Sequence, residues 1–259
     1  GLEIKADDSK ESLDILRHSC AHMMAQAIKE LYPEAKFFVG PVVKEGFYYD
    51  FKVESKISDE DLPTIEKKMK EIADRKLPIT RYETTKEEFY EKFKNDELKQ
   101  AVLKNIKDDT LTIYKQGDFE DLCRGPHLPN TRMIRSFKLT RVAGAYLGGD
   151  EKNEMITRIY GIAFFDKQAL FDYTKMIEEA KKRDHRKLGT ELELFTFNDD
   201  VGAGLPMWLP NGARLRSKLE HLLYKAHRVR GYEPVRGPEI LKSEMWKISG
   251  HYANYKENM

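Results

Sequence analysis

Hydrophobic residues recur at three- and four-residue steps near the start of the chain, which is the spacing of one face of a helix. The residues on this face are Leu13, Leu16, Cys20, Met23, Ala27 and Leu31. We therefore predict an amphipathic helix over residues 12–31, with Ser9 or Ser12 as its cap. Pro33 ends this helix, because proline interrupts the helical hydrogen bonds.

Shorter patterns follow. Two strands are predicted at Phe37–Val43 and Phe47–Val53, joined by a turn that contains Gly46. Further helical periods cover 58–75, the segment around Phe89 and Phe93, and 97–105. Strand-type sequence, rich in β-branched residues, then dominates from Leu111 to Phe165. Its alternating runs are Leu111–Tyr114, Phe137–Val142 and Met155–Tyr160. This mixture predicts an α+β domain.

A long helix is predicted over 167–187, with Gly189 as its end. We place the domain boundary there, with one domain at 1–166, a linker helix at 167–189 and a second domain at 190–259. Within the second domain we predict a short helix or strand at 190–197 and a loop at 199–211. Asn211 then caps a helix that carries a leucine stripe and closes at Gly231, and a strand-like segment at 232–235 is broken by Pro238.

Composition and charge narrow the possible functions. The chain has 259 residues, and 45 Lys+Arg against 44 Asp+Glu leave a net charge of +1. Binding to nucleic acid by bulk charge is excluded, so any basic footprint must be local.

Other features of the sequence bear on the setting of the protein. The sequence contains no run of about eighteen apolar residues, so it predicts no membrane span. Two cysteines are too few for a disulfide framework and favour a reduced, cytoplasmic setting. The chain begins at Gly1 without a signal-peptide pattern, and we expect it to be a piece of something longer.

Two five-residue windows contain three of the seven histidines and both cysteines. One window is His18 to His22 and the other is Cys123 to His127. On a helix, His18 and His22 lie on one face, roughly 200–240° from Leu16 at 100° per residue. They therefore face away from the main apolar stripe, and we expect them to line a cleft rather than the core. Two surface histidines are the alternative interpretation.

The second window favours a convergent site. Cys123 and His127 have the spacing of a metal-ligand or catalytic pair, and the Gly-Pro between them predicts a tight loop. Together with His18 and His22 they form a possible tetrahedral metal set, which Asp121 is placed to orient. By contrast, we expect Cys20 to be an ordinary buried side chain.

Two other features are ambiguous. Tyr48 and Tyr49 point to opposite faces of their strand, so only one of them can face a pocket. The basic run at 181–187 is either a solvated helix end or a phosphate-binding segment.

Five motifs together resemble bacterial threonyl-tRNA synthetases. They are HSCAH at 18–22, GFYYD at 46–50, DLCRGPH at 121–127, AGAY at 143–146 and KRDHRK at 182–187. The resemblance implies a two-layer editing domain of the type that threonyl- and alanyl-tRNA synthetases share. It also implies a linker helix and an incomplete class II catalytic domain. The helix from Asn211 and the segment 232–238 resemble motif 1 of that domain, which forms a homodimer interface.

The resemblance also implies functional residues. The implied catalytic residues are His18, His22, Lys99, Asp121, Cys123 and His127, and Tyr49 would bind substrate. The implied tRNA-binding residues are Lys181, Lys182, Arg183, Arg186 and Lys187. The partner would be tRNA(Thr), and editing would require no cofactor. ATP and zinc would serve the full-length enzyme, at sites that this chain lacks because motifs 2 and 3 and the zinc ligands are missing.

Editing also has a physical rationale. Threonine and serine differ by one methyl group, which a binding site exploits for only about 1–3 kcal/mol, so a second, hydrolytic site is needed. Ester hydrolysis requires a positioned water and a proton acceptor. We expect His18 and Asp121 to supply these, with His22 and His127 in support. Lys99 would face the substrate, and Cys123 would be an acceptor or steric wall rather than a nucleophile. The alternatives are a zinc hydrolase using His18, His22, Cys123 and His127, and a non-catalytic tRNA-binding segment.

Overall fold

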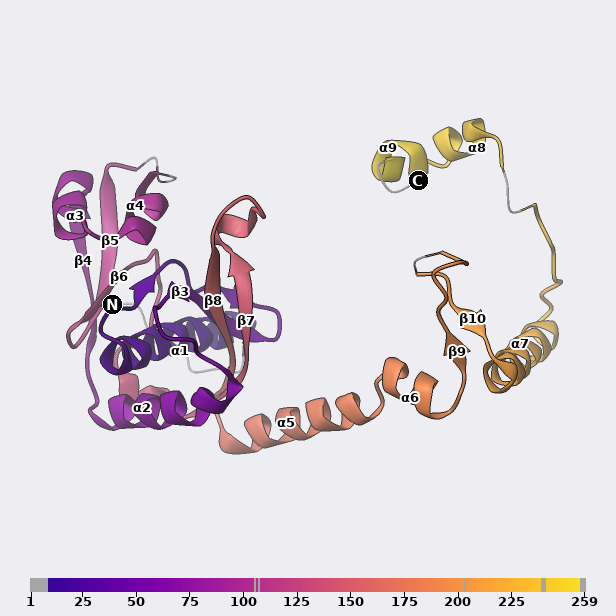
Figure 1. The fold of residues 1–259 in the computed structure, drawn as a ribbon, viewed down its shortest axis with the longest axis horizontal. Coiled ribbons are helices and arrows are strands. Elements are labelled where there is room, and N and C mark those ends of the chain that lie inside the picture. The colour runs from indigo at the N-terminus through magenta and orange to yellow at the C-terminus, as the bar shows by residue number, and fades with distance from the viewer. Residues whose placement is uncertain (1–8, 105, 107, 203, 239–240, 257–259) are drawn as a thin grey trace. The chain divides into compact units, whose positions relative to one another are not determined.

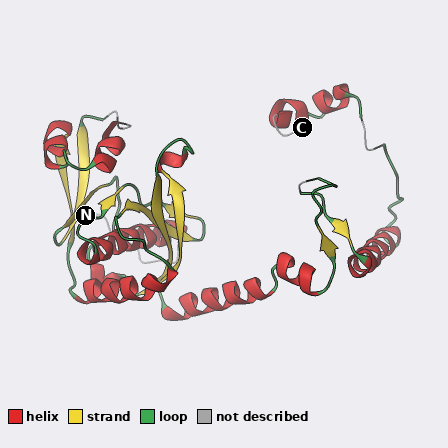
Figure 2. Ribbon diagram, in the orientation of Figure 1, coloured by secondary structure: helices red, strands yellow, loops and turns green. Residues whose placement is uncertain are grey.

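The computed structural model describes residues 9–256, apart from 105, 107, 203, 239 and 240. The chain divides into two compact units between Glu178 and Glu179, inside the helix α5 (Lys167–Lys182). The first unit combines helices and antiparallel strands, as the mixed sequence pattern predicted (Figure 2). Among the described residues, no helix has both the length and the apolar character needed to cross a membrane.

An antiparallel sheet organises the first unit (Figure 1). Its strands run in the order β1 (Lys36–Phe37), β3 (Gly46–Lys52), β8 (Met155–Phe164) and β7 (Ser136–Tyr146), and β2 (Val42–Val43) also pairs with β3. The hairpin of β2 and β3 confirms the predicted hairpin, although its turn consists of Lys44 and Glu45 and Gly46 is the first residue of β3. The predicted strand at Phe37–Val43 is instead interrupted, and only its two ends form strands.

Two helices cover one face of this sheet and enclose the main core. The first, α1 (Lys10–Leu31), contacts β3 and β8, and its N-terminal cap is Ser9, whose side chain accepts a hydrogen bond from the Ser12 amide. The second, α2 (Leu62–Asp74), follows a 3-10 turn at Asp59–Asp61 and packs on α1 and β7. It buries the apolar stripe of Leu62, Ile65, Met69 and Ile72. Both helices confirm the predicted periods.

A smaller sheet lies beside the first. It consists of β4 (Ile79–Thr85), β5 (Thr110–Gln116) and β6 (Phe119–Leu122), all antiparallel. Helices α3 (Lys86–Lys92) and α4 (Glu97–Lys104) occupy the connection between β4 and β5. Phe89 of α3 meets Leu111 and Ile113 of β5 in a separate small core. The sequence analysis did not predict β4, and it placed β6 inside the strand-rich region 111–165 without marking it as a separate strand. Each has only two large apolar side chains among polar ones, which are Ile79 and Tyr82 in β4 and Phe119 and Leu122 in β6.

The C-terminal part differs from the predicted elements at several points, and one of them is that β10 (Met207–Trp208) lies within the loop predicted at 199–211. The helix predicted over 167–187 ends at Lys182, and a new helix, α6 (His185–Glu191), starts where the Asp184 side chain accepts the Arg186 amide hydrogen. Gly189 does not end a helix but lies inside α6. A Cβ atom there would lie 2.5 Å from the ring of Phe195, so glycine allows this ring to pack against the helix.

The next helix, α7 (Pro210–Arg228), does not begin with Asn211 as its cap. Leu209 holds the cap position, and the Asn211 side-chain amide donates to the Leu192 carbonyl instead. The strand predicted at 232–235 is absent from the described residues, because no neighbouring strand pairs with it. The other elements of this unit are β9 (Phe195–Thr196), β10 (Met207–Trp208), α8 (Ser243–Ile248) and α9 (His251–Tyr255).

We expect Gly46→Ala to destabilise the first unit, because the added Cβ would lie 2.2 Å from the backbone oxygen of Gly161 on β8. Overpacking of this kind costs about 1–3 kcal/mol. Gly144→Ala is the matched control, since its Cβ would meet only the flexible, exposed end of Met155. Urea unfolding followed by far-ultraviolet circular dichroism measures both variants. Equal stability of the two would show that β3 and β8 do not approach this closely.

Candidate active site

The structure brings both predicted windows together. His18 and His22 lie on α1, and Cys123 and His127 lie in the loop that follows β6. One ligand-type atom from each of these four residues lies within 4.8 Å of the others. The Cys123 Sγ is 3.2 Å from His18 Nε2 and 3.3 Å from His127 Nε2. We refer to these four residues as the histidine–cysteine cluster.

The cluster is less open than the expected cleft wall. His22 is 5% exposed and His127 is 8% exposed, while His18 and Cys123 remain half-buried. The reason is that α1 has no solvent-facing side along its middle, where every residue from Ser19 to Ile28 is buried. Water therefore has access from the side of His18 and Cys123. The expectations for Cys20 and for the two tyrosines are confirmed, because Cys20 and Tyr49 are fully buried whereas Tyr48 is half-buried.

Two groups that the sequence analysis did not single out orient the cluster. The Ser19 hydroxyl accepts a hydrogen bond from the Leu128 amide and contacts Nδ1 of His127 at 3.2 Å. The Gly125 amide donates to the Cys123 Sγ at 3.1 Å. Ser19 lies between the two histidines in the sequence, but its role depends on the loop that reaches it from more than a hundred residues away.

Burial keeps the imidazoles of the cluster neutral. It lowers the pKa of His127 to about 3, with His18 nearby as a second cause. It also lowers the pKa of His22 well below its usual value, and the neighbouring His127, His18 and Lys99 act in the same direction. The pKa of His18 is lowered by burial too, although a hydrogen bond with the Pro126 backbone opposes the shift. Neutral imidazoles can accept a proton from water.

The Cys123 side chain is a thiol rather than a thiolate. Burial raises the pKa of this thiol to about 12, although the Gly125 amide acts in the opposite direction. Because the thiolate is the nucleophilic form, the metal-free site does not present Cys123 as a nucleophile.

Asp121, Lys99 and Tyr49 form a second group of buried side chains next to the cluster. Both carboxylate oxygens of Asp121 are engaged, one by the ammonium of Lys99 and by the Leu122 amide, and the other by the Tyr49 hydroxyl. Burial raises the pKa of Asp121 and lowers that of Lys99 to about 8, whereas their mutual contact favours the charged form of both. Asp121 is therefore placed to hold Lys99 and Tyr49. It is not placed to take a proton from water.

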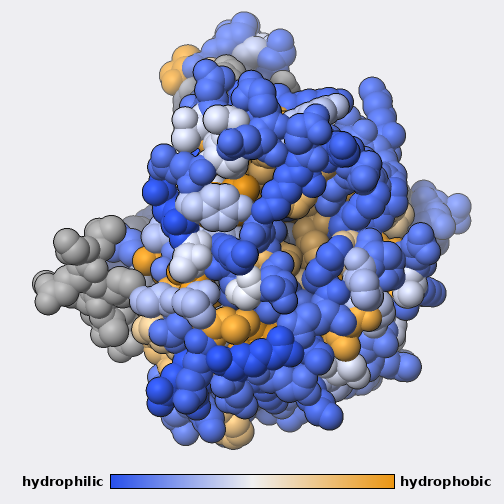
Figure 3. Space-filling model, turned by 90° about the vertical axis from the view of Figure 1, so that its left-hand side faces the viewer, coloured by the Kyte–Doolittle hydropathy of each residue, from blue (hydrophilic) through white to orange (hydrophobic). Residues whose placement is uncertain are grey.

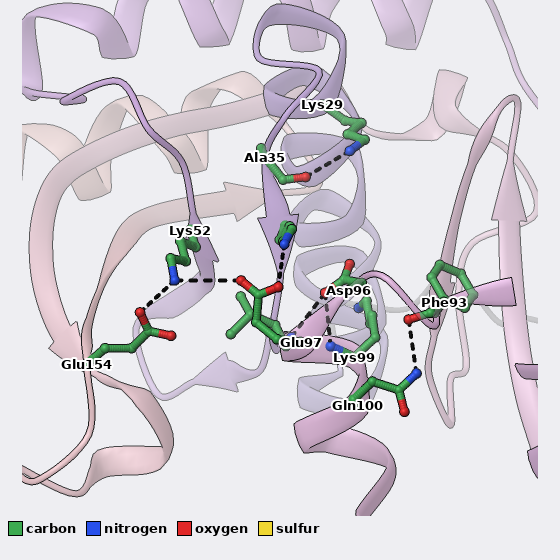
Figure 4. A network of polar contacts seen from close by, with 11 residues as sticks. Lys29, Ala35, Lys52, Phe93, Asp96, Glu97, Lys99, Gln100 and Glu154 are labelled. Carbon is green, nitrogen blue, oxygen red and sulfur yellow. Dashed lines mark hydrogen bonds and ion pairs between the residues drawn. The ribbon is translucent and has the colours of Figure 1, made fainter. Parts of the chain in front are cut away.

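Helix α4 carries Lys99 into this position (Figure 4). Its first amides are capped by Asp96, whose side chain accepts hydrogen bonds from Leu98 and Lys99. Next along the chain, Glu97 contacts both Lys36 and Lys52, the latter at 3.6 Å, and thereby joins α4 to the main sheet. A cavity of about 290 Å³ opens between these elements, and Lys99, Phe37 and Phe119 are part of its lining.

The face drawn in Figure 3, which is the left-hand side of Figure 1, is mostly hydrophilic, with smaller hydrophobic areas among the polar side chains. The predicted tRNA-binding run lies apart from the cluster in the sequence, across the end of α5 and the start of α6. Four of its five cations contact acidic side chains of the same segment: Lys182 and Arg183 contact Glu179, Arg186 contacts Asp184, and Lys187 contacts Glu191. Only Lys181 has no ion pair among the described residues.

The donor set of the cluster fits a zinc ion. Imidazole nitrogens and a cysteine sulfur, which zinc binds as the thiolate, are preferred zinc ligands, and the atoms of the cluster already converge. Ser19 also holds the second ring nitrogen of His127, which is the outer support that metal-bound histidines usually have. The same contacts also suit a site in which the cluster holds a water molecule.

Comparison with known proteins matches part of the chain to a domain found in tRNA synthetases. The family model "Threonyl and Alanyl tRNA synthetase second additional domain" matches residues 111–160. This segment contains Asp121, Cys123 and His127, but not the residues supplied by α1, β3 and α4.

Several relatives are similar over nearly the whole chain. Threonine–tRNA ligase of Campylobacter jejuni (serotype O:6) is 73% identical over 257 residues, which is 99% of this chain and 43% of that protein. The Campylobacter lari enzyme is 74% identical over 98% of this chain and 42% of its own length. That of Nautilia profundicola is 68% identical over all of this chain and 42% of its own length. The chain is therefore similar over nearly its whole length to bacterial threonine–tRNA ligases, and it spans less than half the length of these relatives.

We expect the first unit to lose stability as the pH falls below about 6.5. The unfolded chain binds a proton on His127 near that pH, whereas the folded chain resists protonation down to about 3. Stability is therefore complete above the unfolded pKa and decreases through this window, by about 2 kcal/mol at pH 5 for this residue. Urea unfolding near pH 7 and pH 5 measures the effect. His127→Gln should reduce the pH dependence, and an unchanged dependence would contradict the buried neutral imidazole.

Lys99→Met should destabilise the first unit more than the double variant Lys99→Met/Asp121→Asn. The single change leaves a buried carboxylate without its cation, which typically costs about 3–5 kcal/mol, whereas the double change removes both charges. Thermal unfolding of the two variants and the parent protein measures the difference. A double variant less stable than the single one would show that the Asp121 charge is not balanced by Lys99.

Proposed function

We propose that the first unit hydrolyses the ester of mischarged Ser-tRNA(Thr). The observation that carries this proposal is the half-open cluster of three neutral imidazoles, backed by the buried Lys99, Asp121 and Tyr49. The similarity to threonine–tRNA ligases and the match to the second additional domain support it. We infer that the chain acts as an aminoacyl-tRNA editing domain.

His18 is assigned the proton transfer. It is the only histidine of the cluster that is half-exposed, its imidazole is neutral, and its Nε2 is turned toward Cys123. A water held between His18 and His127 would lose its proton to an imidazole as it attacks the ester carbonyl. The ammonium of Lys99 would stabilise the negative charge that develops on the carbonyl oxygen. His22 supports both rings, and Asp121 positions Lys99.

Selectivity follows from the limited space. A serine ester brings a hydroxymethyl group to the cluster, and threonine adds one methyl group that must either clash with the packed rings or displace the attacking water. The ring centroids of His18 and His127 lie 4.4 Å apart, and those of His22 and His127 lie 4.3 Å apart. Such packing leaves little room, so Thr-tRNA would be spared.

The whole protein, of which this chain would be one part, would attach threonine to tRNA(Thr) using ATP. The relatives carry the name threonine–tRNA ligase, and this is the basis of the proposal. The second unit would be the start of a class II catalytic domain, and the full-length protein would be a cytoplasmic homodimer. The surface of helix α7 is consistent with the proposed dimer, because an interface would cover apolar side chains that are about half exposed here. These are Leu215, Leu219, Leu222 and Leu223. Motifs 2 and 3, and the ATP and zinc sites of the parent, would lie outside this chain.

A zinc-dependent hydrolase is the second candidate, because the donor set fits the ion. In that case His18, His22, Cys123 and His127 would hold zinc, which supplies a water of lowered pKa. Ser19 would then orient His127, and Lys99 would keep its role toward the carbonyl oxygen.

We expect His18→Ala to slow hydrolysis of Ser-tRNA(Thr) by about 10²–10⁴-fold, because it removes the proton acceptor. It should also weaken discrimination against Thr-tRNA(Thr), because the same side chain limits the space. His22→Ala should slow the reaction with less effect on selectivity. Deacylation of both tRNAs by the purified chain measures these effects, and His251→Ala, at an exposed histidine of the second unit, is the control. Full activity of the His18 and His22 variants would remove the cluster as the active centre.

The same assay separates the two candidates. Activity that survives a chelator, with no zinc in elemental analysis, favours the metal-free site. Activity lost with the chelator and restored by zinc favours the metal site, and His127→Ala should then also release the ion.

A further inference from the structure

The main sheet has a second face that the proposed active site does not use. Strand register places Tyr48 opposite Tyr160, and Asp50 opposite Arg158. These four side chains lie on the face opposite to the core, since the alternate residues Tyr49 and Ile159 pack in the core with α1. We call this surface the outer sheet face.

A β-bulge adds cations to the outer sheet face. Lys138 pairs with Ile162 and Arg141 pairs with Tyr160, with a register shift between Leu139 and Arg141. In a regular strand, residues three apart point to opposite faces. The extra residue of the bulge brings Lys138 and Arg141 to the same face instead. Both side chains are exposed.

The arginines on this face are stacked on tyrosine rings. The Arg158 guanidinium carbon lies 3.8 Å from the centre of the Tyr48 ring, and that of Arg141 lies 4.1 Å from the centre of Tyr160. Arg158 also forms a two-bond ion pair with Asp50, at 2.6 and 2.7 Å, so its charge is balanced. Arg141 and Lys138 have no ion pair among the described residues.

This combination suits the backbone of a nucleic acid. The Arg141 guanidinium lies against the Tyr160 ring and is exposed, so its N–H donors are available to phosphate oxygens. Protein surfaces that bind RNA combine such cations with aromatic rings. The net charge of the chain is only +1, so a local concentration of unpaired cations is significant.

We propose that the outer sheet face binds the phosphodiester backbone of the acceptor arm of the tRNA. The identity of this RNA rests on the proposed function. Tyr48 and Tyr49 are adjacent on β3 and point to opposite faces of the sheet. The outer sheet face is therefore the back of the same strand whose Tyr49 contacts Asp121. Backbone contacts at this face would position the arm without reading its sequence.

The test measures binding of a fluorescent RNA hairpin with an acceptor-stem duplex and a single-stranded ACCA end, over a series of salt concentrations. Arg141→Ala and Lys138→Ala should each weaken binding several-fold and reduce the slope of log affinity against log salt by about 0.7–0.9, the value for one phosphate contact. Arg141→Lys should keep the slope but recover only part of the affinity, because lysine does not stack as a planar group. Lys94→Ala, which removes an exposed cation in the turn after α3, is the control.

Affinity and slope in Arg141→Ala and Lys138→Ala equal to those of Lys94→Ala would overturn this proposal. Full recovery of affinity by Arg141→Lys would overturn the role of stacking. The proposed function is tested separately by hydrolysis of 3′-O-seryl-adenosine, which lacks an acceptor arm. Failure of the parent chain in that assay would count against the active site and leave the RNA-binding result to stand on its own.

Discussion

The rest of the structure depends on the burial of the polar side of α1. Ser19, His22 and Gln26 follow the helical spacing of one stripe, and all three are at most 5% exposed. A buried polar group without a partner costs about 1–3 kcal/mol, so this stripe requires complementary groups. The segment from β5 to the loop after β6 supplies hydrogen-bond partners for Ser19 and Gln26 and ring contacts for His22. Gln116 bonds to Gln26 at 2.6 Å, and both His127 and the Leu128 amide contact Ser19. The small sheet is thereby held at one position on α1.

The same burial determines the chemistry. A surface pair of histidines would be partly protonated near neutral pH, whereas here desolvation favours the neutral rings and the protonated thiol. The one strongly charged contact behind them, between Lys99 and Asp121, is itself buried, and it requires α4 to lie against the main sheet. The exposed pairs of Glu97 with Lys36 and Lys52 contribute little energy individually. Their effect is to fix the direction from which Lys99 enters.

How far the sequence predicts this site depends on the range of the interactions. Local periodicity was sufficient for α1 and α2 and for the hairpin of β2 and β3, because each is encoded by its own residues. The windows at His18 and Cys123 were found because residues of unusual type cluster in the sequence, and the predicted convergence is confirmed. The partnership of Ser19 with His127 was not predictable, because it depends on how two segments pack. For the same reason we expected Asp121 to help position the attacking water and accept its proton. In the structure, both oxygens of Asp121 are instead bound by Lys99, Tyr49 and the Leu122 amide.

Strand β3 shows how one short segment can serve two purposes. Its side chains alternate between the core face, where Tyr49 donates to Asp121, and the outer sheet face, where Tyr48 stacks on Arg158. A one-residue slip of β3 against β8 would reverse both assignments at once, because side chains alternate with a period of two. The close approach at Gly46, where a Cβ would meet the Gly161 oxygen, disfavours any register that places a larger residue there. The pairing that buries Tyr49 beside Asp121 is therefore also the pairing that places Tyr48 and Arg158 on the outer sheet face.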